Sequence, residues 1–243
     1  MSADALVGGS RAGQRVDSFV VSSDSVVGRR QPSPDASAIV RNGYDALEDR
    51  YLQAFSADDP SPRSRYLNVV LARLGPESLV LDLGCGPGRP VAATLARRCR
   101  LMAIDLSRKQ LELARRHAPS ALLVQADMTQ LHVAPGSLEA VVAFYCLIHV
   151  PRELVGDVLA RVARWLEPGG VFVATLGAGD SPDSVEDDWL GVPMFFSHFD
   201  AATNLRLVER AGLLIESSDV IQEVEHDGKE VSFLWVVARK PGH

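Results

Sequence analysis

The amino-acid sequence predicts an α/β fold built on a doubly wound, mostly parallel β-sheet. Short apolar runs alternate with segments of helical periodicity over most of the chain, which is typical of such a sheet. The first run, Leu79 to Leu83, ends in alternately placed glycines, Gly84, Gly86 and Gly88, that predict a sharp turn towards a helix. The last two runs flank an Asp-Gly dipeptide, which predicts an antiparallel hairpin at one edge of the sheet.

The core elements are expected to follow one another with short connections. After the strand that ends at the glycine turn, the predicted helices cover residues 90–98, 107–117, 152–166 and 201–211. The predicted strands cover residues 101–104, 122–125, 138–145, 171–176, 213–220, 220–225 and 230–238. Ser107 is the expected cap of its helix, because its side chain can accept from the first free backbone N–H groups.

Three further segments complete the predicted organisation. Residues 1–34 are rich in Ser, Gly, Asp and Arg and are expected to form a flexible N-terminal extension. Residues 35–76 predict a helical cap of two helices, the first ending near Phe55 and the second covering residues 63–74. Residues 77–243 are the predicted core. Within them, residues 177–199 form the longest irregular stretch, which we expect to act as a lid.

Composition narrows the class of protein. A chain of 243 residues fits one α/β domain with accessory segments. The formal net charge of −6 argues against a nucleic-acid partner or an anionic membrane surface. The sequence shows no apolar run long enough to span a bilayer and no signal peptide, so we expect a cytoplasmic protein. The expected oligomeric state is a monomer or a homodimer. Its three cysteines are widely spaced, as expected for buried thiols in a reducing compartment.

The glycine turn excludes two common phosphate-binding motifs. The dinucleotide fingerprint requires a third small residue where this chain has Arg89, and no Gly-Lys-Ser/Thr follows to make a P-loop. What remains, Asp82-x-Gly84-x-Gly86-x-Gly88, resembles the first motif of the class I S-adenosylmethionine-dependent methyltransferases. The resemblance covers about residues 40–240 and implies a Rossmann-like, seven-stranded sheet with a reversed seventh strand. It also implies S-adenosylmethionine as cofactor and S-adenosylhomocysteine as product.

Candidate cofactor residues stand where the parallel strands end, because ligands of open α/β sheets bind beyond the carboxyl ends of the strands. Asp105, 17 positions beyond Gly88, is placed to meet the paired hydroxyls of an unphosphorylated ribose. The resemblance implies that Asp127 accepts from the adenine amino group while Met128 covers the ring. Asp82 would face the amino-acid end, or alternatively cap the turn. The full predicted cofactor site comprises Tyr44, Tyr51, Asp82, Gly84, Cys85, Gly86, Asp105, Leu106, Asp127, Met128 and Phe144.

Tyr44 and Tyr51 belong to the predicted helical cap and are expected to contribute to this site from there. They resemble a Tyr-Asp…Tyr segment that many small-molecule members of the family carry before the first strand. The alternative is that both tyrosines only pack helices together.

The acceptor site is expected after the fourth core strand, at Phe144 to Pro151. This stretch has neither the Asn/Asp-Pro-Pro-aromatic motif of enzymes that methylate exocyclic nitrogens of bases, nor carboxylates for a divalent cation. We therefore predict no catalytic metal. The stretch resembles the small-molecule branch of the family, in which an apolar turn leads to a histidine.

His149 is the first candidate for a general base, which a hydroxyl acceptor or an acidic carbon would need. It could instead pack over the cofactor or cap the next helix, and an amine acceptor would not need it. His198 is the second candidate. The predicted acceptor walls are Tyr145, Trp189, Met194 and Phe196. The alternative is that the aromatic residues of this segment only cover the sheet edge.

The sequence thus predicts methyl transfer from S-adenosylmethionine to a small, largely apolar acceptor at oxygen or nitrogen. The excess of 22 Arg over 3 Lys hints at a GC-rich bacterial genome and at tailoring of natural products in secondary metabolism. One alternative is a cyclase or regulatory protein that binds S-adenosylmethionine without methylating. A dinucleotide-dependent oxidoreductase is the other, against which Arg89 argues.

Overall fold

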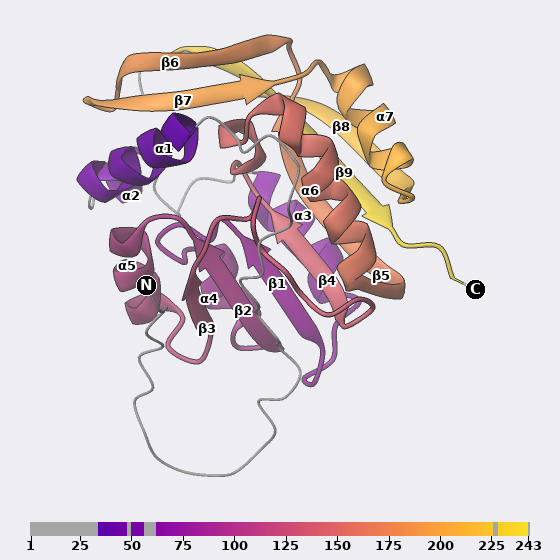
Figure 1. The fold of residues 1–243 in the computed structure, drawn as a ribbon. Helices are drawn as coiled ribbons and strands as arrows, with labels where there is room; N and C mark the ends of the chain where they lie inside the picture. The colour runs from indigo at the N-terminus through magenta and orange to yellow at the C-terminus, as the bar shows by residue number, and fades with distance from the viewer. Residues whose placement is uncertain (1–33, 48–49, 56–61, 226–227, 243) are drawn as a thin grey trace.

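A computed structural model describes residues 34–47, 50–55, 62–225 and 228–242 of the chain. The expected flexible extension therefore lies outside the described residues up to position 33. The main sheet has the order β3-β2-β1-β4-β5-β9-β8 (Figure 1). Its strands are β1 (Leu79–Leu83), β2 (Arg100–Asp105), β3 (Leu122–Gln125), β4 (Leu138–Ala143), β5 (Leu166–Gly177), β8 (Leu214–Val224) and β9 (Glu230–Arg239).

The sheet is parallel from β3 to β5, and only β9 runs against its neighbours. This confirms the doubly wound sheet with a reversed last strand. One detail differs from the prediction. The expected strands 213–220 and 220–225 are one continuous strand, because β8 pairs with β9 along its whole length, from Leu214 opposite Arg239 to Val224 opposite Glu230. The hairpin lies at the sheet edge as predicted, with the reversed strand β9 between β5 and the outermost strand β8. Asp227, in the predicted turn, lies outside the described residues.

Helices cover both faces of the sheet and enclose two apolar clusters. On one face, α6 (Arg152–Trp165) and α7 (Ala201–Arg210) bury side chains against the sheet. On the other, α3 (Pro62–Leu71), α4 (Val91–Leu95) and α5 (Arg108–His117) do the same, and Tyr66 stacks on Trp235 with ring centroids 4.5 Å apart. Ser107 caps α5 by accepting from the backbone N–H of Gln110, as predicted. The predicted helix 90–98 is shorter in the structure, where α4 ends at Leu95.

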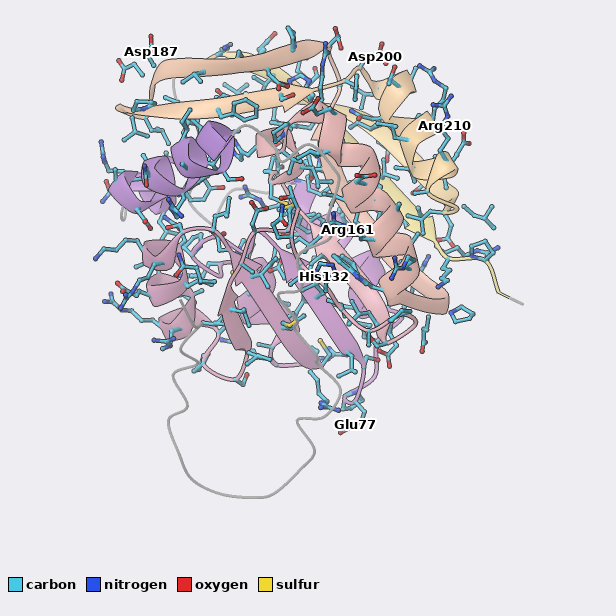
Figure 2. All side chains as sticks on the ribbon, in the orientation of Figure 1. Glu77, His132, Arg161, Asp187, Asp200 and Arg210 are labelled. Carbon is cyan, nitrogen blue, oxygen red and sulfur yellow. The ribbon has the colours of Figure 1, made fainter. Side chains whose placement is uncertain are left out.

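The segment expected to be irregular, residues 177–199, is largely a β-hairpin, so that prediction was wrong. Strand β6 (Ser181–Trp189) pairs antiparallel with β7 (Val192–His198) through the two-residue turn Leu190-Gly191. Both turn residues have positive φ, 54° and 84°, as the hairpin turn that matches strand twist requires. The acidic β6 carries no apolar alternation, because its side chains from Pro182 to Asp188 are all exposed. Asp187 projects outward from this layer (Figure 2).

The N-terminal region contains three described helices rather than two: α1 (Pro34–Leu47), α2 (Arg50–Ala54) and α3. Helix α1 packs against β7 in a third apolar cluster made of Ala36, Val40, Leu47, Trp189, Val192, Met194 and Phe195. We call α1 and the β6–β7 hairpin the cap. The cap lies over the carboxyl ends of the central strands, and the site lies beneath it (Figure 1). No helix in the described part of the chain is long and apolar enough to cross a membrane.

Candidate functional site

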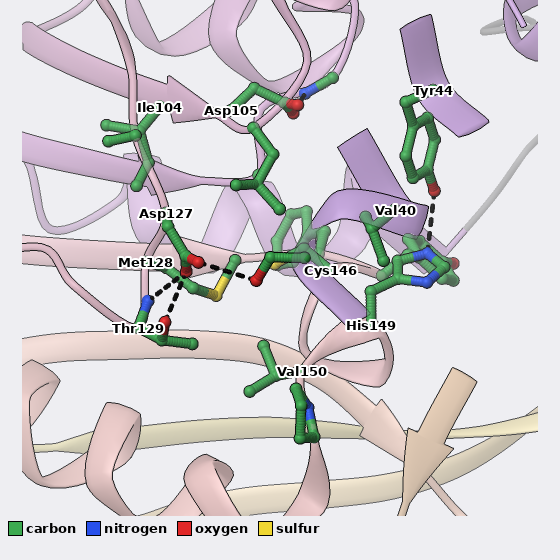
Figure 3. A pocket seen from close by; sticks show the side chains of 18 of the residues that line it. Val40, Tyr44, Ile104, Asp105, Asp127, Met128, Thr129, Cys146, His149 and Val150 are labelled. Carbon is green, nitrogen blue, oxygen red and sulfur yellow. Dashed lines mark hydrogen bonds between the residues drawn. The ribbon is translucent and has the colours of Figure 1, made fainter. Parts of the chain in front are cut away.

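A cavity of about 680 Å³, partly open to solvent, lies between α1 and the carboxyl ends of β1 to β4 (Figure 3). Most of the predicted cofactor residues line it. They are Tyr44, Tyr51, Gly84, Gly86, Asp105, Leu106, Asp127, Met128 and Phe144, and the candidates Tyr145 and His149 line it too.

The first two glycines of the turn, Gly84 and Gly86, serve different purposes. Both have positive φ, 65° at Gly84 and 54° at Gly86, a conformation that disfavours side chains. A Cβ atom at Gly84 would lie 2.4 Å from Cβ of Cys146, so the turn packs directly on the chain after β4. A Cβ atom at Gly86 would meet no atom within 4 Å. The backbone at Gly86 therefore faces open space that a ligand can approach.

Two acidic side chains lie close to this turn. Asp105, at the end of β2, accepts from the backbone N–H groups of Gly86 and Ser107, both at 2.8 Å. Burial nevertheless raises the pKa of Asp105 to about 6. Asp82 is 2% exposed, and its Oδ2 has no hydrogen-bond partner among the described residues. Its pKa is raised by burial and by the charge of Asp105. Buried carboxylates held in this way favour a ligand that donates hydrogen bonds or carries positive charge.

Asp82 and Cys85 line a smaller cavity of about 450 Å³ beside the first, together with Gly84, Gly86 and Arg63. The turn therefore forms one border of both spaces. Arg63, at the start of α3, was not predicted as a site residue, because no sequence pattern marks it. Among the described residues it makes no ion pair, and its guanidinium lies 4.3 Å from the centroid of the Tyr145 ring.

Asp127, after β3, is held from two sides. Its Oδ1 accepts from the backbone N–H and the hydroxyl of Thr129, at 2.8 and 2.7 Å. Its Oδ2 accepts from the hydroxyl of Ser37 on α1, at 2.8 Å (Figure 3). Ser37, which the sequence did not reveal as a site residue, thus ties the cap to the third core strand. Met128 and Ile104 add apolar surface beside this carboxylate.

A second cavity of about 850 Å³ adjoins the first. Tyr44, Tyr51, Tyr145 and His149 line both, so these four side chains form a shared wall. Trp189 and Phe196, two of the predicted acceptor walls, line the second cavity, with ring centroids 5.7 Å apart. Met194 does not line either cavity, because its side chain is fully buried between β7 and α1.

His149 is 9% exposed and makes two hydrogen bonds. Its Nδ1 lies 2.8 Å from the backbone carbonyl oxygen of Phe195, and its Nε2 lies 2.9 Å from the hydroxyl of Tyr44 (Figure 3). Burial lowers its pKa to about 4, so the ring is neutral at pH 7. His149 is thus the candidate base that lies where the two cavities meet.

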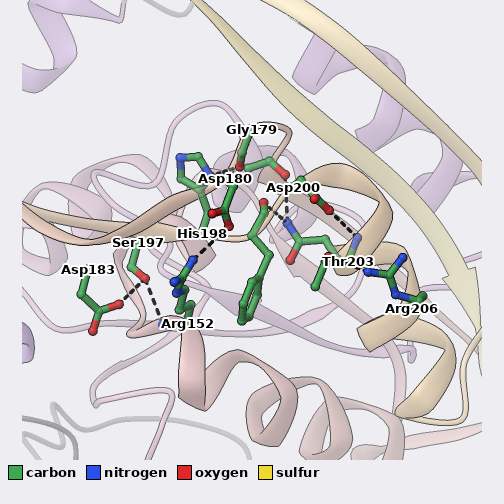
Figure 4. A network of polar contacts seen from close by, with 12 residues as sticks. Arg152, Gly179, Asp180, Asp183, Ser197, His198, Asp200, Thr203 and Arg206 are labelled. Atoms are coloured by element: carbon green, nitrogen blue, oxygen red, sulfur yellow. Dashed lines mark hydrogen bonds and ion pairs between the residues drawn. The ribbon is translucent and has the colours of Figure 1, made fainter.

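His198 lies elsewhere. It sits at the end of β7, with Nδ1 2.6 Å from the carbonyl oxygen of Gly179 (Figure 4). It lines neither of the two adjoining cavities but an open groove beyond them. Nearby, Arg152 pairs with Asp180 at 2.9 Å, and its backbone N–H donates to Ser197. These contacts fasten the base of the hairpin to α6 and carry no reactive group into the site.

The second cavity also contains an acid that sequence reasoning missed. The hydroxyl of Tyr145 donates to Glu223 of β8, with distances of 2.9 and 2.8 Å to its two oxygens. Nε1 of Trp235 lies 3.3 Å from the same carboxylate. Glu223 comes from a polar edge strand far along the chain, and only the pairing of β8 with β9 brings it to the wall. No local pattern in the sequence could have indicated this.

Among the residues that the structure describes, no group of three or more His, Cys, Asp or Glu side chains is arranged to hold a metal ion. The expectation that catalysis needs no metal stays a prediction.

This sheet order and the cavity at the carboxyl ends of its strands define the architecture of an α/β protein that binds a nucleoside-type ligand. Residues 80–170 match the family model described as a methyltransferase domain. Methyltransferase GfsG of Streptomyces halstedii is 34% identical over 169 residues, which are 63% of this chain and 59% of that relative. The chain spans between about half and three fifths of the length of the curated relatives it matches first.

Solved structures share the fold. The 1,6-didemethyltoxoflavin-N1-methyltransferase of Burkholderia thailandensis, with bound 1,6-didemethyltoxoflavin and S-adenosylhomocysteine, aligns with a TM-score of 0.66 at 21% identity, over 94% of this chain and 98% of its own. The cyclase SpnF aligns with a TM-score of 0.57 at 17% identity, over 74% of this chain and 81% of its own. Together, the glycine turn, the sheet order and these matches show that the chain is similar in sequence and fold to the class I S-adenosylmethionine-dependent methyltransferases.

Proposed function

We propose that this protein transfers a methyl group from S-adenosylmethionine to a small, largely apolar acceptor at oxygen or nitrogen. One observation carries the proposal: two cavities meet at a single wall of Tyr44, Tyr51, Tyr145 and His149. The first contains hydrogen-bonding groups suited to a nucleoside, and the second is lined mainly by aromatic rings. A methyl donor and a methyl acceptor need this arrangement, because the reacting atoms must approach in line with water excluded.

The residues of the first cavity fit S-adenosylmethionine. The open backbone at Gly86 leaves room for the ligand, and Asp105 beside it can accept from two ribose hydroxyls. Asp127 can accept from the adenine amino group, with Met128 against the ring. The unpartnered Oδ2 of Asp82 suits the α-ammonium group, and the guanidinium of Arg63 suits the carboxylate at the same end.

When bound, S-adenosylmethionine supplies an electrophilic methyl group on a positively charged sulfur. The chain contributes position and exclusion of water. The aromatic rings of the shared wall surround the point where the two cavities meet, and Trp189 and Phe196 bound the acceptor from the cap side. His149 is the proposed base, and its neutral ring leaves one nitrogen able to accept a proton.

Two findings support a small acceptor. The second cavity is lined mainly by aromatic and apolar side chains, as small-molecule sites are. The 1,6-didemethyltoxoflavin-N1-methyltransferase, which has the same fold, was solved with bound 1,6-didemethyltoxoflavin. We further predict that the protein modifies natural products, that it is located in the cytoplasm, and that it is a monomer or a homodimer.

The test is formation of S-adenosylhomocysteine, followed by mass spectrometry, with panels of phenols, carboxylic acids and amines of one to three rings. We expect methylated product with at least one oxygen or nitrogen acceptor, in equal amount to S-adenosylhomocysteine. A protein that binds S-adenosylmethionine but yields a rearranged, unmethylated compound would support the cyclase alternative. Binding of a nicotinamide dinucleotide in place of S-adenosylmethionine would overturn the proposal.

A further inference from the structure

We propose that Tyr44 carries the proton of the acceptor to His149, and that this pair adapts the site to a hydroxyl acceptor. The inference deepens the proposed function, on which it rests. It assigns to Tyr44 a catalytic part beyond lining the cofactor cavity, and it narrows the acceptor from oxygen or nitrogen to oxygen.

The hydrogen bonds of His149 fix which ring nitrogen carries the proton. A backbone carbonyl can only accept, so the contact between Nδ1 and the oxygen of Phe195 requires a proton on Nδ1. In a neutral imidazole the other nitrogen, Nε2, then has a free lone pair. The hydroxyl of Tyr44 must be its donor, at 2.9 Å. The only lone pair of His149 that can take a proton is therefore reached through Tyr44.

Tyr44 is held in this position by a hydrogen bond from α5 and by the aromatic rings around it. Nε2 of Gln110 donates to its backbone carbonyl at 3.3 Å. Its ring makes edge contacts with Tyr51, His149 and Trp189, with centroids 5.6, 5.4 and 5.9 Å away. The hydroxyl thus lies in the wall between the two cavities with its proton directed at the imidazole.

The proposed step balances as follows. The acceptor oxygen forms a bond to the methyl carbon, while the electron pair of the broken S–C bond stays on sulfur. The acceptor's proton passes to the oxygen of Tyr44 as the proton of Tyr44 passes to Nε2 of His149. The ring becomes an imidazolium that donates to Phe195 through Nδ1. One positive charge is lost at sulfur and one appears on the histidine, so the total charge of the site is unchanged.

A relay that ends on His149 serves oxygen rather than nitrogen. A neutral amine can be methylated without a base, whereas a hydroxyl must lose its proton. A hydroxyl that is gaining a methyl group becomes a strong acid as the bond forms, and even a weak base then accepts its proton. Burial is the main cause that raises the pKa of the Tyr44 hydroxyl. Tyr51, Asp105 and Cys146 raise this pKa further, and the positive charge of Arg63 lowers it.

Nitrogen NMR of histidine-labelled protein tests the arrangement without any acceptor. We expect His149, assigned by loss of its signals in the His149→Gln variant, to show a protonated Nδ1 and an unprotonated Nε2 that accepts a hydrogen bond. In Tyr44→Phe, the Nε2 signal should move towards that of a free lone pair. A protonated Nε2 in the wild type, or an Nε2 signal unaffected by Tyr44→Phe, would overturn the proposal.

Kinetics with the acceptors found in the product screen supply the second test. For a hydroxyl acceptor we expect Tyr44→Phe and His149→Gln each to lower kcat by on the order of 10²-fold, with the double variant no slower than the worse single variant. Affinity for S-adenosylhomocysteine should stay within about threefold, and the exposed His132→Gln is the matched control. Equal loss for an amine acceptor, or independent losses that multiply, would refute the relay. Absence of S-adenosylhomocysteine binding would instead refute the proposed function, whatever the NMR shows.

Discussion

Glycine-to-alanine substitutions can distinguish a loss of stability caused by backbone strain from a loss of ligand binding. Two glycines of the turn after β1 and one glycine elsewhere in the chain are suitable for this comparison. Gly84, Gly86 and Gly136 all have positive φ, but only Gly84 has a neighbour within reach of an added Cβ atom. We expect Gly136→Ala to cost about 1–2 kcal/mol of unfolding free energy through strain alone and to leave binding intact. Gly86→Ala should cost a similar amount and also weaken S-adenosylhomocysteine binding, because its methyl group would enter the open space.

Gly84→Ala should be the most destabilising of the three, by about 3 kcal/mol or more, because the contact with Cys146 adds overpacking to strain. Urea unfolding of the three variants checks the order. Equal losses at Gly84 and Gly136 would show that the chain after β4 does not pack on the turn.

Asp105 makes stability depend on pH in a predictable direction. Its pKa is raised from 3.8 to about 6 on folding, so the native state holds the proton more tightly than the unfolded chain. Its stabilising contribution is complete below pH 3.8 and is lost as the pH rises through 6. In the variant Asp105→Asn this side chain does not titrate, so this pH-dependent loss of stability does not occur. Relative to wild type, it should therefore gain up to about 3 kcal/mol between pH 4 and pH 7.

Urea unfolding of both proteins across this pH range measures the difference, in which titrating groups unaffected by the substitution cancel. A constant difference between them would contradict the assigned burial of this carboxylate. S-adenosylhomocysteine binding should fall in the variant, since the amide loses one acceptor oxygen.

At this scale, the sequence predicted well the residues whose place follows from topology. Asp105 and Asp127 follow strands, and the carboxyl ends of parallel strands meet at one edge, so their convergence could be foreseen. Ser37, Arg63 and Glu223 could not be foreseen, because each reaches the site from an element whose packing depends on contacts far away in the chain. His149 lies where the two cavities meet, and its partner Tyr44 was assigned only to the cofactor.

At the scale of elements, the cap is held together by close packing of α1 on β7. A Cβ atom at Gly43 would lie 2.8 Å from Cε of Met194 and 2.9 Å from the carbonyl oxygen of Pro193. The first neighbour is flexible and the second is backbone, so α1 would have to move away from the hairpin.

We therefore expect Gly43→Ala to speed hydrogen exchange in α1 and β7 together and to weaken S-adenosylhomocysteine binding about tenfold, with the sheet unaffected. The neighbouring exposed residue offers the control Asn42→Ala. In an isolated helix the change at Gly43 would be stabilising, because Ala is the better helix former. A more stable variant with unchanged exchange would show that α1 does not pack closely on the hairpin.

The hairpin is also the element that sequence reasoning missed. A strand is recognised by alternation of apolar and polar side chains, and β6 is exposed along nearly its whole length. Its strand conformation comes from pairing with β7, whose Val192 and Met194 are buried against α1. Aromatic walls could still be predicted in this segment, because its aromatic residues are evident from the amino-acid composition even though β6 shows no alternation of apolar and polar residues.

At the scale of the whole molecule, the order and direction of the strands in the sheet determine where the site forms. Alternating strands and helices predicted the parallel region, and the Asp-Gly turn predicted the antiparallel end. The place of β9 between β5 and β8 depends on long-range pairing that no local pattern reveals. That placement decides which side chains reach the second cavity, since Glu223 and Phe233 come from β8 and β9.

Calorimetric titration of the purified protein with S-adenosylhomocysteine tests the central claim most directly, because it requires no acceptor. We predict one site per chain with a dissociation constant in the micromolar range or below, weakened at least tenfold by Asp105→Asn and unchanged by Gly136→Ala. Nicotinamide dinucleotides should give no binding heat. A folded wild-type protein that binds no S-adenosylhomocysteine, or binds it equally well without the Asp105 carboxylate, would contradict the account.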